Sequence, residues 1–200
     1  MIPFLVPLLL LMAAPFWESQ PPKEWTDLQL EALLSDSPWA QMMPGPGTSA
    51  VPVNCRLALA APVEQGEKEL ARRAALRTKP GPKGEEDPGA LEYRLWLEDN
   101  RATQIILAIR LTSNQGLLDD REVRRMEEES VMRVGKKKIK MTGHFPPSQG
   151  DPFLRMAFPR EVQLSDKTVT FELYLPGVSA PFRSAEFKIK DMVVAGKLEI

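Results

Sequence analysis

Residues 168–175 of this 200-residue chain read TVTFELYL, and this stretch decides the fold. Its apolar side chains recur at every second position, so that Val169, Phe171 and Leu173 share one face. Such alternation with a period of two is typical of a β-strand that buries one face. The following Pro176-Gly177 ends the strand, because proline lacks a backbone N–H donor and glycine favours turns.

The same alternation recurs on both sides of this strand. Residues 138–142 and 185–190 show it, and residues 153–158, 192–194 and 198–200 are further short runs that we expect to be strands. Turn residues such as Ala195-Gly196 separate them. Several consecutive strands with one apolar face predict an antiparallel sheet, or meander, with its other face in water. We therefore expect a β-rich part over residues 138–200.

The amino-terminal part carries helix signals instead. Thr26 can cap a helix, and Gln29, three residues later, can complete a capping box. The apolar face of this helix would be formed by Leu30, Leu33 and Leu34. The helix should end before Pro38, because the residue that precedes a proline is disfavoured in the α region.

A second, short helical turn is expected to follow directly. Ser37 would cap it, Pro38 would take its first position, and Trp39 would lie within it. Together with the preceding helix this turn gives a predicted helical segment over residues 25–41. Its two tryptophans, Trp25 and Trp39, carry enough apolar area to dock the segment on the main body.

The middle of the chain gives weaker patterns. Residues 51–62 resemble a strand and residues 64–79 a helix, and the Pro/Gly-rich residues 80–89 read as an exposed linker. Leucine and tyrosine alternate with other residues at 91–97, which predicts a strand. Residues 101–112 fit both a helical face and a buried strand rich in β-branched residues, and of the two we choose a helix.

These elements predict one α+β domain over residues 18–200, with amino-terminal helices packed on a mainly antiparallel sheet. A chain of this length buries about 70% of its unfolded surface, so a hydrophobic core suffices without disulfides. Cys55 is the only cysteine and admits no internal disulfide. Its place in an apolar run favours a buried, inert thiol over a reactive or intermolecular one.

Residues 1–17 contain no charged side chain, whereas charges recur throughout the rest of the chain. The apolar run is shorter than the roughly 20 residues that span a bilayer and has the length of a signal-peptide core. We expect cleavage near Ala14. The alternative is an uncleaved anchor that continues to Trp17, which would be the chain's one contact with a membrane. Both interpretations place residues 18–200 outside the cytosol, in the periplasm or the extracellular space.

The formal net charge of −1 argues against nucleic acid and anionic lipid surfaces as partners. The lysines of residues 136–140 are offset by Glu127, Glu128 and Glu129, so a solvated face explains them. His144, in an expected turn, is the only histidine, which disfavours a histidine metal site or a histidine-based triad. No phosphate loop or calcium loop is present, and we expect no metal and no cofactor.

Three residues form a candidate binding surface. Trp25 and Trp39 can stack on a sugar ring or on an apolar partner, although aromatic residues that anchor a helix are commoner. Arg160 can clamp an anion with two parallel hydrogen bonds, or pair with a nearby carboxylate. We predict no catalytic residue.

Five sequence blocks together resemble one group of proteins. They are Trp25-Thr26-Asp27, Asp36-Ser37-Pro38-Trp39-Ala40, Phe158-Pro159-Arg160, the residues 187–192 (FKIKDM) and the residues 196–199 (GKLE). This set resembles small exported proteins of unknown function of the acidobacterial type. The resemblance implies export and a shared fold, and it implies no activity, cofactor or catalytic residue.

Two functions fit these observations. The first is a non-enzymatic envelope or secreted binding module, with an envelope protein or a glycan as its possible partner. The second is a hydrolase of extracellular polysaccharide that uses a pair of carboxylates and no histidine. The scarcity of catalytic motifs favours the first.

Overall fold

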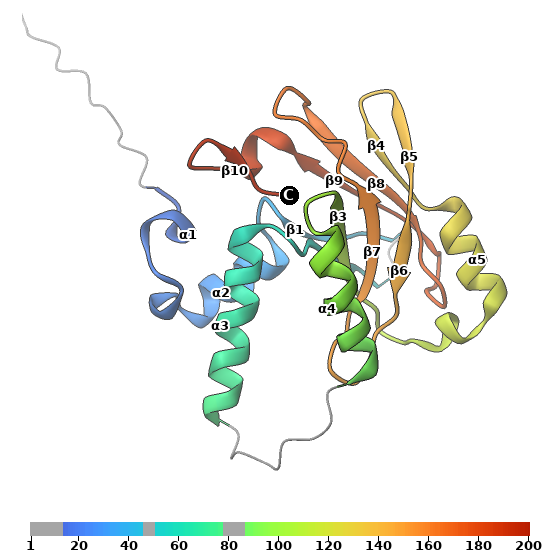
Figure 1. Cartoon of the computed structure of the whole chain (residues 1–200), viewed down its shortest axis with the longest axis horizontal. Helices are drawn as coiled ribbons and strands as arrows, with labels where there is room; N and C mark the ends of the chain where they lie inside the picture. Colours follow the sequence, from blue (N-terminus) through green and yellow to red (C-terminus); the bar gives the residue numbers. More distant parts are fainter. Residues whose placement is uncertain (1–13, 46–50, 78–86) are drawn as a thin grey trace, which may run out of the picture.

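The computed structural model describes residues 14–45, 51–77 and 87–200, which form an α+β fold with antiparallel sheets (Figure 1). The helices are α1 (Phe16–Ser19), η1 (Pro22–Glu24), α2 (Asp27–Ser35), α3 (Ala61–Arg77), α4 (Pro88–Asn100), η2 (Gln115–Leu118), α5 (Asp120–Glu129) and η3 (Ile189–Met192). The strands are β1 (Ala40–Met43), β2 (Val53–Leu57), β3 (Gln104–Arg110), β4 (Val131–Val134), β5 (Lys137–Lys140), β6 (Gly143–Phe145), β7 (Leu154–Pro159), β8 (Thr168–Tyr174), β9 (Phe182–Lys188), β10 (Val193–Val194) and β11 (Lys197–Leu198).

Two of the sequence predictions fall mainly outside the described residues. The apolar core of the expected export leader lies within residues 1–13, and most of the expected linker lies within residues 78–86. In the part of the chain that the structure describes, no helix is both long and apolar enough to cross a membrane.

Two antiparallel sheets enclose the main core. The first has the strand order β1-β2-β3-β7-β6 and the second the order β5-β4-β8-β9. Their facing side chains form one buried cluster, in which Phe171 of β8 stands edge-on to Phe158 of β7 at 5.2 Å and to Phe187 of β9 at 5.9 Å. The short β10-β11 hairpin follows near the carboxyl end of the chain.

The alternating residues 168–174 form β8, as predicted. Val169, Phe171 and Leu173 are at most 1% exposed and point into the core. On the other face, Glu172 of β8 pairs with Arg133 of β4 at 2.6 Å, and both side chains are about two-fifths exposed. The prediction of an antiparallel, β-rich part is therefore confirmed, and β8 and β9 keep one face towards water. Residues 153–158 differ, because they contribute to β7, a strand inside the first sheet that is buried on both faces.

Helix α2 begins as its sequence predicts. The backbone N–H of Gln29 donates to the Thr26 hydroxyl at 3.1 Å, and the backbone N–H of Thr26 donates to the Gln29 side chain at 2.7 Å. The expected leucine face is buried in the core. The predicted second helical turn is wrong. Ser37 and Ala40 exchange two backbone hydrogen bonds across a tight turn, and β1 begins at Ala40.

Two further predictions, both in the middle of the chain, are wrong. The strand predicted at 91–97 is helix α4, and the helix predicted at 101–112 is strand β3. In contrast, the strand within 51–62 and the helix at 64–79 are confirmed as β2 and α3.

Helices α3 and α4 lie over the outer face of the first sheet (Figure 1). A small second core fills this face, formed by Ala58, Leu59, Ile106, Ala108, Phe153 and Ala157 with Tyr93, Trp96 and Leu97 of α4 packed against it. Asp87 caps α4 and also accepts a hydrogen bond from the backbone N–H of Gly150. This carboxylate therefore fastens the start of α4 to the loop that precedes β7.

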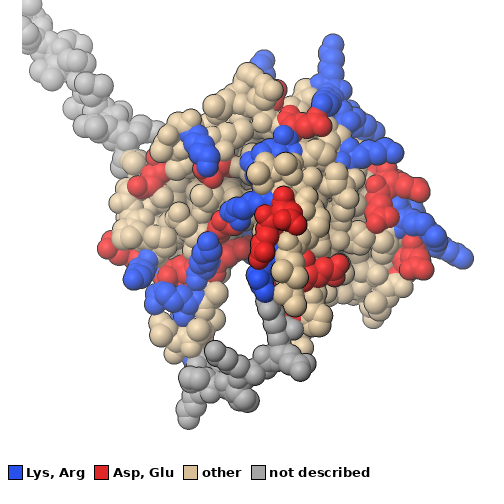
Figure 2. All heavy atoms as spheres, in the orientation of Figure 1, with Lys and Arg blue, Asp and Glu red and all other residues tan. Residues whose placement is uncertain are grey.

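The surface carries charges of both signs side by side (Figure 2). The four lysines of the β4-β5 hairpin region are exposed, as predicted. Lys137 pairs with Glu161, and Lys138 lines a shallow pocket together with Glu128 and Glu129. This arrangement agrees with a solvated face.

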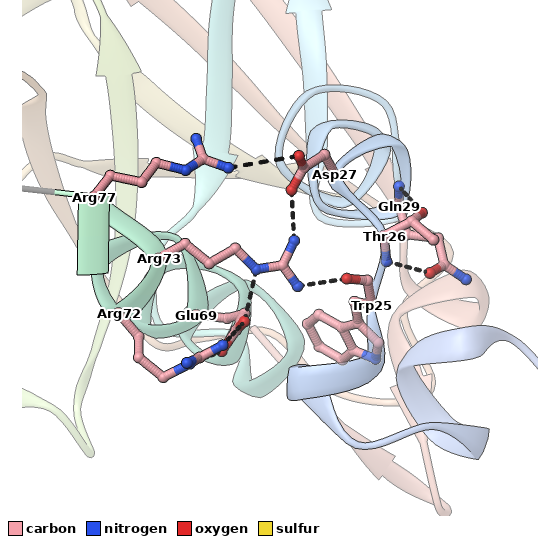
Figure 3. Close-up of polar contacts among 8 residues, drawn as sticks. All are labelled: Trp25, Thr26, Asp27, Gln29, Glu69, Arg72, Arg73 and Arg77. Carbon is pink, nitrogen blue, oxygen red and sulfur yellow. Dashed lines mark hydrogen bonds and ion pairs between the residues drawn. The ribbon is translucent and has the colours of Figure 1, made fainter. Parts of the chain in front are cut away.

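A buried carboxylate of α3 holds the arginine that joins this helix to the start of α2 (Figure 3). Glu69 is 4% exposed, and it accepts hydrogen bonds from Arg72 Nε and Arg73 Nε, each at 2.7 Å. Arg73 in turn donates to the Asp27 carboxylate and to the Trp25 carbonyl. The two arginines lower the pKa of Glu69 from 4.5 to about 2.

We expect Glu69→Gln to lower the thermal unfolding midpoint at neutral pH, because the neutral amide cannot replace a carboxylate shared by two arginines. The folded-state pKa lies below the unfolded-state value, so this carboxylate stabilises the fold fully above pH 4.5 and progressively less as the pH falls towards 2. The difference between wild type and variant should therefore shrink over that interval. Thermal unfolding followed by circular dichroism tests it, with exposed Glu128→Gln as the control. A difference that is independent of pH would contradict this role.

Candidate functional site

The two tryptophans of the predicted binding surface lie in the core. Trp25 is 2% exposed, and its indole N–H donates to the Gln20 carbonyl at 3.0 Å. Trp39 is fully buried, and its indole N–H donates to the Glu199 carbonyl at 2.8 Å. Phe16 and Trp17 of α1 stand edge-on to these rings at 5.4 and 5.5 Å. The rings join the amino-terminal segment to the domain and present no open face.

Arg160, the third predicted residue, is half-buried, and burial lowers its pKa. Its Nη2 atom donates to the Gln104 carbonyl at 3.2 Å. It lines an open pocket of about 660 Å³ together with Arg101 and Glu199. Glu199 thus accepts a hydrogen bond from Trp39 and lines the same pocket as Arg160, whereas Trp25 does not line this pocket. The binding surface formed by the three residues stays a prediction.

The surroundings of Cys55 and His144 are those of residues that stabilise the fold. Cys55 is fully buried, and desolvation raises the pKa of its thiol to about 12, so the reactive thiolate is disfavoured. His144 lies in strand β6 and not in the expected turn. Its Nδ1 atom is 3.3 Å from the Glu127 carboxylate, so it pairs β6 with α5.

A different set of residues forms the most distinctive site, on the outer face of the first sheet. Arg56 of β2 lies opposite Ala108 of β3, and Ala108 lies opposite Arg155 of β7. Side chains that share such a row of an antiparallel sheet lie on the same face. Two arginines therefore flank one alanine in the middle of a sheet, where apolar residues are expected.

Both guanidinium groups are buried against aromatic rings. The Arg56 side chain is 9% exposed, and its Cζ atom lies 4.1 Å from the centroid of the Phe153 ring. The Arg155 side chain is 11% exposed, and its Cζ atom lies 4.6 Å from the centroid of the Tyr93 ring. Such stacking is a favourable contact for a planar cation.

Each of these arginines has one acidic partner. Glu67 of α3 approaches Arg56 at 2.7 Å, and Asp151 pairs with Arg155. Burial lowers the pKa of Arg56; the Glu67 carboxylate opposes this shift, and the neighbouring Arg155 adds to it. The Nε atom of Arg56 is buried and has no hydrogen-bond partner among the residues that the structure describes.

These arginines form the floor of a groove between α3 and α4, with a volume of about 610 Å³. Its apolar walls are formed by two helices and a loop. They are Leu70, Ala71 and Ala74 of α3, Ala90 and Tyr93 of α4, and Pro152 and Phe153 of the loop before β7. A smaller pocket of about 330 Å³ shares Arg56, Leu70 and Phe153 with it. That pocket adds Arg110, and it has Asp27 and Glu31 in its lining. We call the two together the arginine groove.

Sequence reasoning missed the arginine groove, although a signal was present. Arg56 and Arg155 are single charges inside the apolar runs that become β2 and β7. A charge inside a buried strand is costly and calls for an explanation. Their meeting depends on β3 lying between the two strands, which no local pattern reveals.

The described residues hold no group of three or more histidine, cysteine, aspartate or glutamate side chains that could bind a metal ion. Comparison of the chain with protein-family models, with curated proteins and with solved structures gave no match. The chemistry of the arginine groove is therefore the basis for a functional proposal.

Proposed function

We propose that this protein is an exported, non-enzymatic binding module that holds an anionic ligand in the arginine groove. The observation that supports this function is the pair of buried arginines, Arg56 and Arg155, on the floor of an open groove. Guanidinium groups recognise carboxylates and phosphates through paired hydrogen bonds.

The buried arginines are costly for a purely structural role. Apolar residues of similar volume in place of a buried ion pair are often neutral or stabilising. Here the cost includes an unpartnered Nε atom on Arg56. The position of these buried groups on the floor of an open groove favours a role in binding.

The balance of charge around Phe153 also favours an anion. Three guanidinium groups lie within 6 Å of its ring centroid, those of Arg56 at 4.1 Å and of Arg110 and Arg155 at 5.9 Å. Two carboxylates, Glu67 and Asp151, pair with Arg56 and Arg155. Arg110 is exposed and has no carboxylate within 4.0 Å among the described residues. Asp27 and Glu31 line the pocket that contains Arg110, and Asp27 is engaged by Arg73 and Arg77, so Arg110 can pair with an anionic ligand.

The alternative function, a carboxylate-based hydrolase, has less support. Both carboxylates that line the larger part of the groove, Glu67 and Asp151, are engaged by arginines. Export is part of this proposal, and so is membership of the group of exported proteins that the sequence resembles. Both rest on residues 1–17 and on the shared sequence blocks.

Titration calorimetry with benzoate, hexanoate, decanoate and inorganic phosphate tests the binding function. We expect at least one of these anions to bind the wild-type protein at one site. Arg110→Gln should weaken that binding about tenfold, because a hydrogen bond to a charged group contributes about 1.5–3 kcal/mol. Arg124→Gln, which removes an exposed arginine of α5, is the matched control and should leave binding unchanged.

Two results would contradict the proposal. One is that none of the anions binds, and the other is that both arginine variants weaken binding equally. Incubation of the protein with a panel of polysaccharides tests the alternative, because turnover that a single aspartate or glutamate substitution abolishes would establish a hydrolase.

A further inference from the structure

We infer, on the basis of the proposed binding function, that the anionic group held in the arginine groove is the carboxylate of a small zwitterion. The ligand class is a free α-amino acid with an apolar side chain. Its binding site is the smaller pocket of the groove, of about 330 Å³, which presents charges of both signs around an apolar surface.

A row of side chains from three neighbouring strands forms the floor of this pocket. Met42 of β1 lies opposite Asn54 of β2, and Asn54 lies opposite Arg110 of β3. Side chains in such a row share one face of the sheet. Because neighbouring strands are about 4.8 Å apart, the backbones of Met42 and Arg110 are separated by about 10 Å. The positive charge of Arg110 therefore belongs to the β3 side of the pocket.

Helix α2 forms the opposite wall. It packs against β1 and β2, and its residues Asp27, Glu31 and Leu34 line the pocket. Residues three or four positions apart lie on one face of a helix, so these side chains are neighbours. The acidic groups of the pocket thus come from the β1 side, and Arg110 comes from the β3 side.

One acidic and one basic group of this pocket have no counter-charge within the protein. Asp27 is engaged by Arg73 and Arg77 (Figure 3). Glu31 and Arg110 are both exposed, and neither has an oppositely charged side chain within 4.0 Å among the described residues. They line the same pocket without reaching each other. A ligand with an ammonium group beside Glu31 and a carboxylate beside Arg110 would complete both ion pairs.

Two polar groups on the floor can assist these charges. Arg56 is 8% exposed, and its buried Nε atom has no hydrogen-bond partner among the residues that the structure describes. Asn54 donates its side-chain N–H to the Leu34 carbonyl at 3.4 Å, so its side-chain oxygen can accept a hydrogen bond from an ammonium group. The floor therefore offers a donor as well as an acceptor.

The rest of the lining is mainly apolar and suits a small side chain. Leu34, Met42, Leu70 and Phe153 contribute to it, and Met42 and Leu70 are 47% and 43% exposed. An apolar side chain of the ligand would remove part of this surface from water. The volume lies near the lower end of the range for ligand pockets, about 300–1,000 Å³. A free amino acid fits this volume better than a long peptide.

Titration calorimetry with leucine and two of its analogues tests the inference. 4-Methylpentanoate is leucine without the amino group, and leucinamide has no carboxylate. We expect leucine to bind the wild-type protein at one site, about fivefold more tightly than 4-methylpentanoate, which is the effect of one exposed ion pair. We expect leucinamide not to bind measurably.

Variants of the two unpaired charges locate the site. Glu31→Gln should weaken leucine binding about fivefold, the effect of one exposed ion pair, and should not weaken 4-methylpentanoate binding. Arg110→Gln should weaken the binding of both. The matched control is Glu92→Gln, because Glu92 of α4 is exposed and lines neither pocket of the groove. All three positions are exposed, so the variants should fold, and circular dichroism checks this.

Each alternative result has a distinct meaning. If 4-methylpentanoate binds as tightly as leucine and Arg110→Gln weakens it, the groove binds anions as proposed and the zwitterion is overturned. Equal effects of Glu31→Gln and Glu92→Gln on leucine binding would overturn the ammonium site. Tighter binding of leucyl-leucine than of leucine would overturn the free amino acid. If neither leucine nor any simple anion binds, the proposed function fails as well.

Discussion

Replacement of Trp39 by alanine is expected to lower the free energy of unfolding by about 3–5 kcal/mol, the range for removal of a large buried aromatic side chain. Trp39 is fully buried, and its ring stands edge-on to that of Trp17 at 5.5 Å. Its indole N–H also donates to the Glu199 carbonyl at 2.8 Å, which ties the turn before β1 to the residue that follows β11. The variant loses apolar burial, leaves a cavity and leaves that carbonyl without its donor. Unfolding in urea measures the change.

Trp39→Phe separates these contributions. Phenylalanine keeps part of the aromatic volume and loses the indole hydrogen bond, whose net contribution is about 1 kcal/mol. It should therefore cost clearly less than Trp39→Ala. If Trp39→Ala instead unfolds like the wild type but binds no ligand, the ring is a binding platform, as the sequence had suggested.

The sequence predicts the carboxyl-terminal sheet well because that sheet has two unlike faces. In β9, and in β8 as far as Leu173, buried residues alternate with residues on the outer face, so burial appears directly as alternation. The capping box of α2 is predicted for a similar reason, since Thr26 and Gln29 act locally. Neither prediction requires knowledge of a distant neighbour.

The sequence patterns of strand β3 and helix α4 predict the opposite element in each case, for physical reasons. Strand β3 is central in its sheet and covered on both faces, with Ile105 and Leu107 in the main core and Ile106 in the second core. A strand buried on both sides shows no alternation. The apolar residues of helix α4 that pack on the second core are the partly buried Tyr93, Trp96 and Leu97, whereas Leu95 is half-exposed. Leu91, Tyr93, Leu95 and Leu97 still fall at alternate positions of the sequence, and this spacing imitates a period of two.

The arginine groove shows where prediction from a single sequence ends. Arg56 and Arg155 stand out in their own strands, but the order β2-β3-β7 is what brings them into one row. That order follows from packing of the whole domain. A lone charge in an apolar run can therefore be flagged from sequence, whereas its partner cannot.

The second large effect is expected at this row. Glu67→Gln should lower the free energy of unfolding by about 2–4 kcal/mol, because it leaves the buried Arg56 guanidinium without its counter-charge. Glu67 is 27% exposed, so we expect less than the full cost for a completely buried pair. The matched control is Glu172→Gln. Its partner Arg133 lies at a comparable 2.6 Å, but both side chains are about two-fifths exposed, and such pairs contribute about 0–1 kcal/mol.

The double variant Arg56→Met/Glu67→Gln decides what the pair is for. Removal of both charges from the groove floor should recover most of the stability that Glu67→Gln loses, because methionine packs on Phe153 without a desolvation cost. Urea unfolding of Arg56→Met, of Glu67→Gln and of the double variant measures the coupling energy between the two side chains. If the double variant is as unstable as Glu67→Gln, the pair holds the helix to the sheet and serves the fold. If the double variant is as stable as the wild type but no longer binds anions, the fold does not need Arg56. The arginine then serves ligand binding.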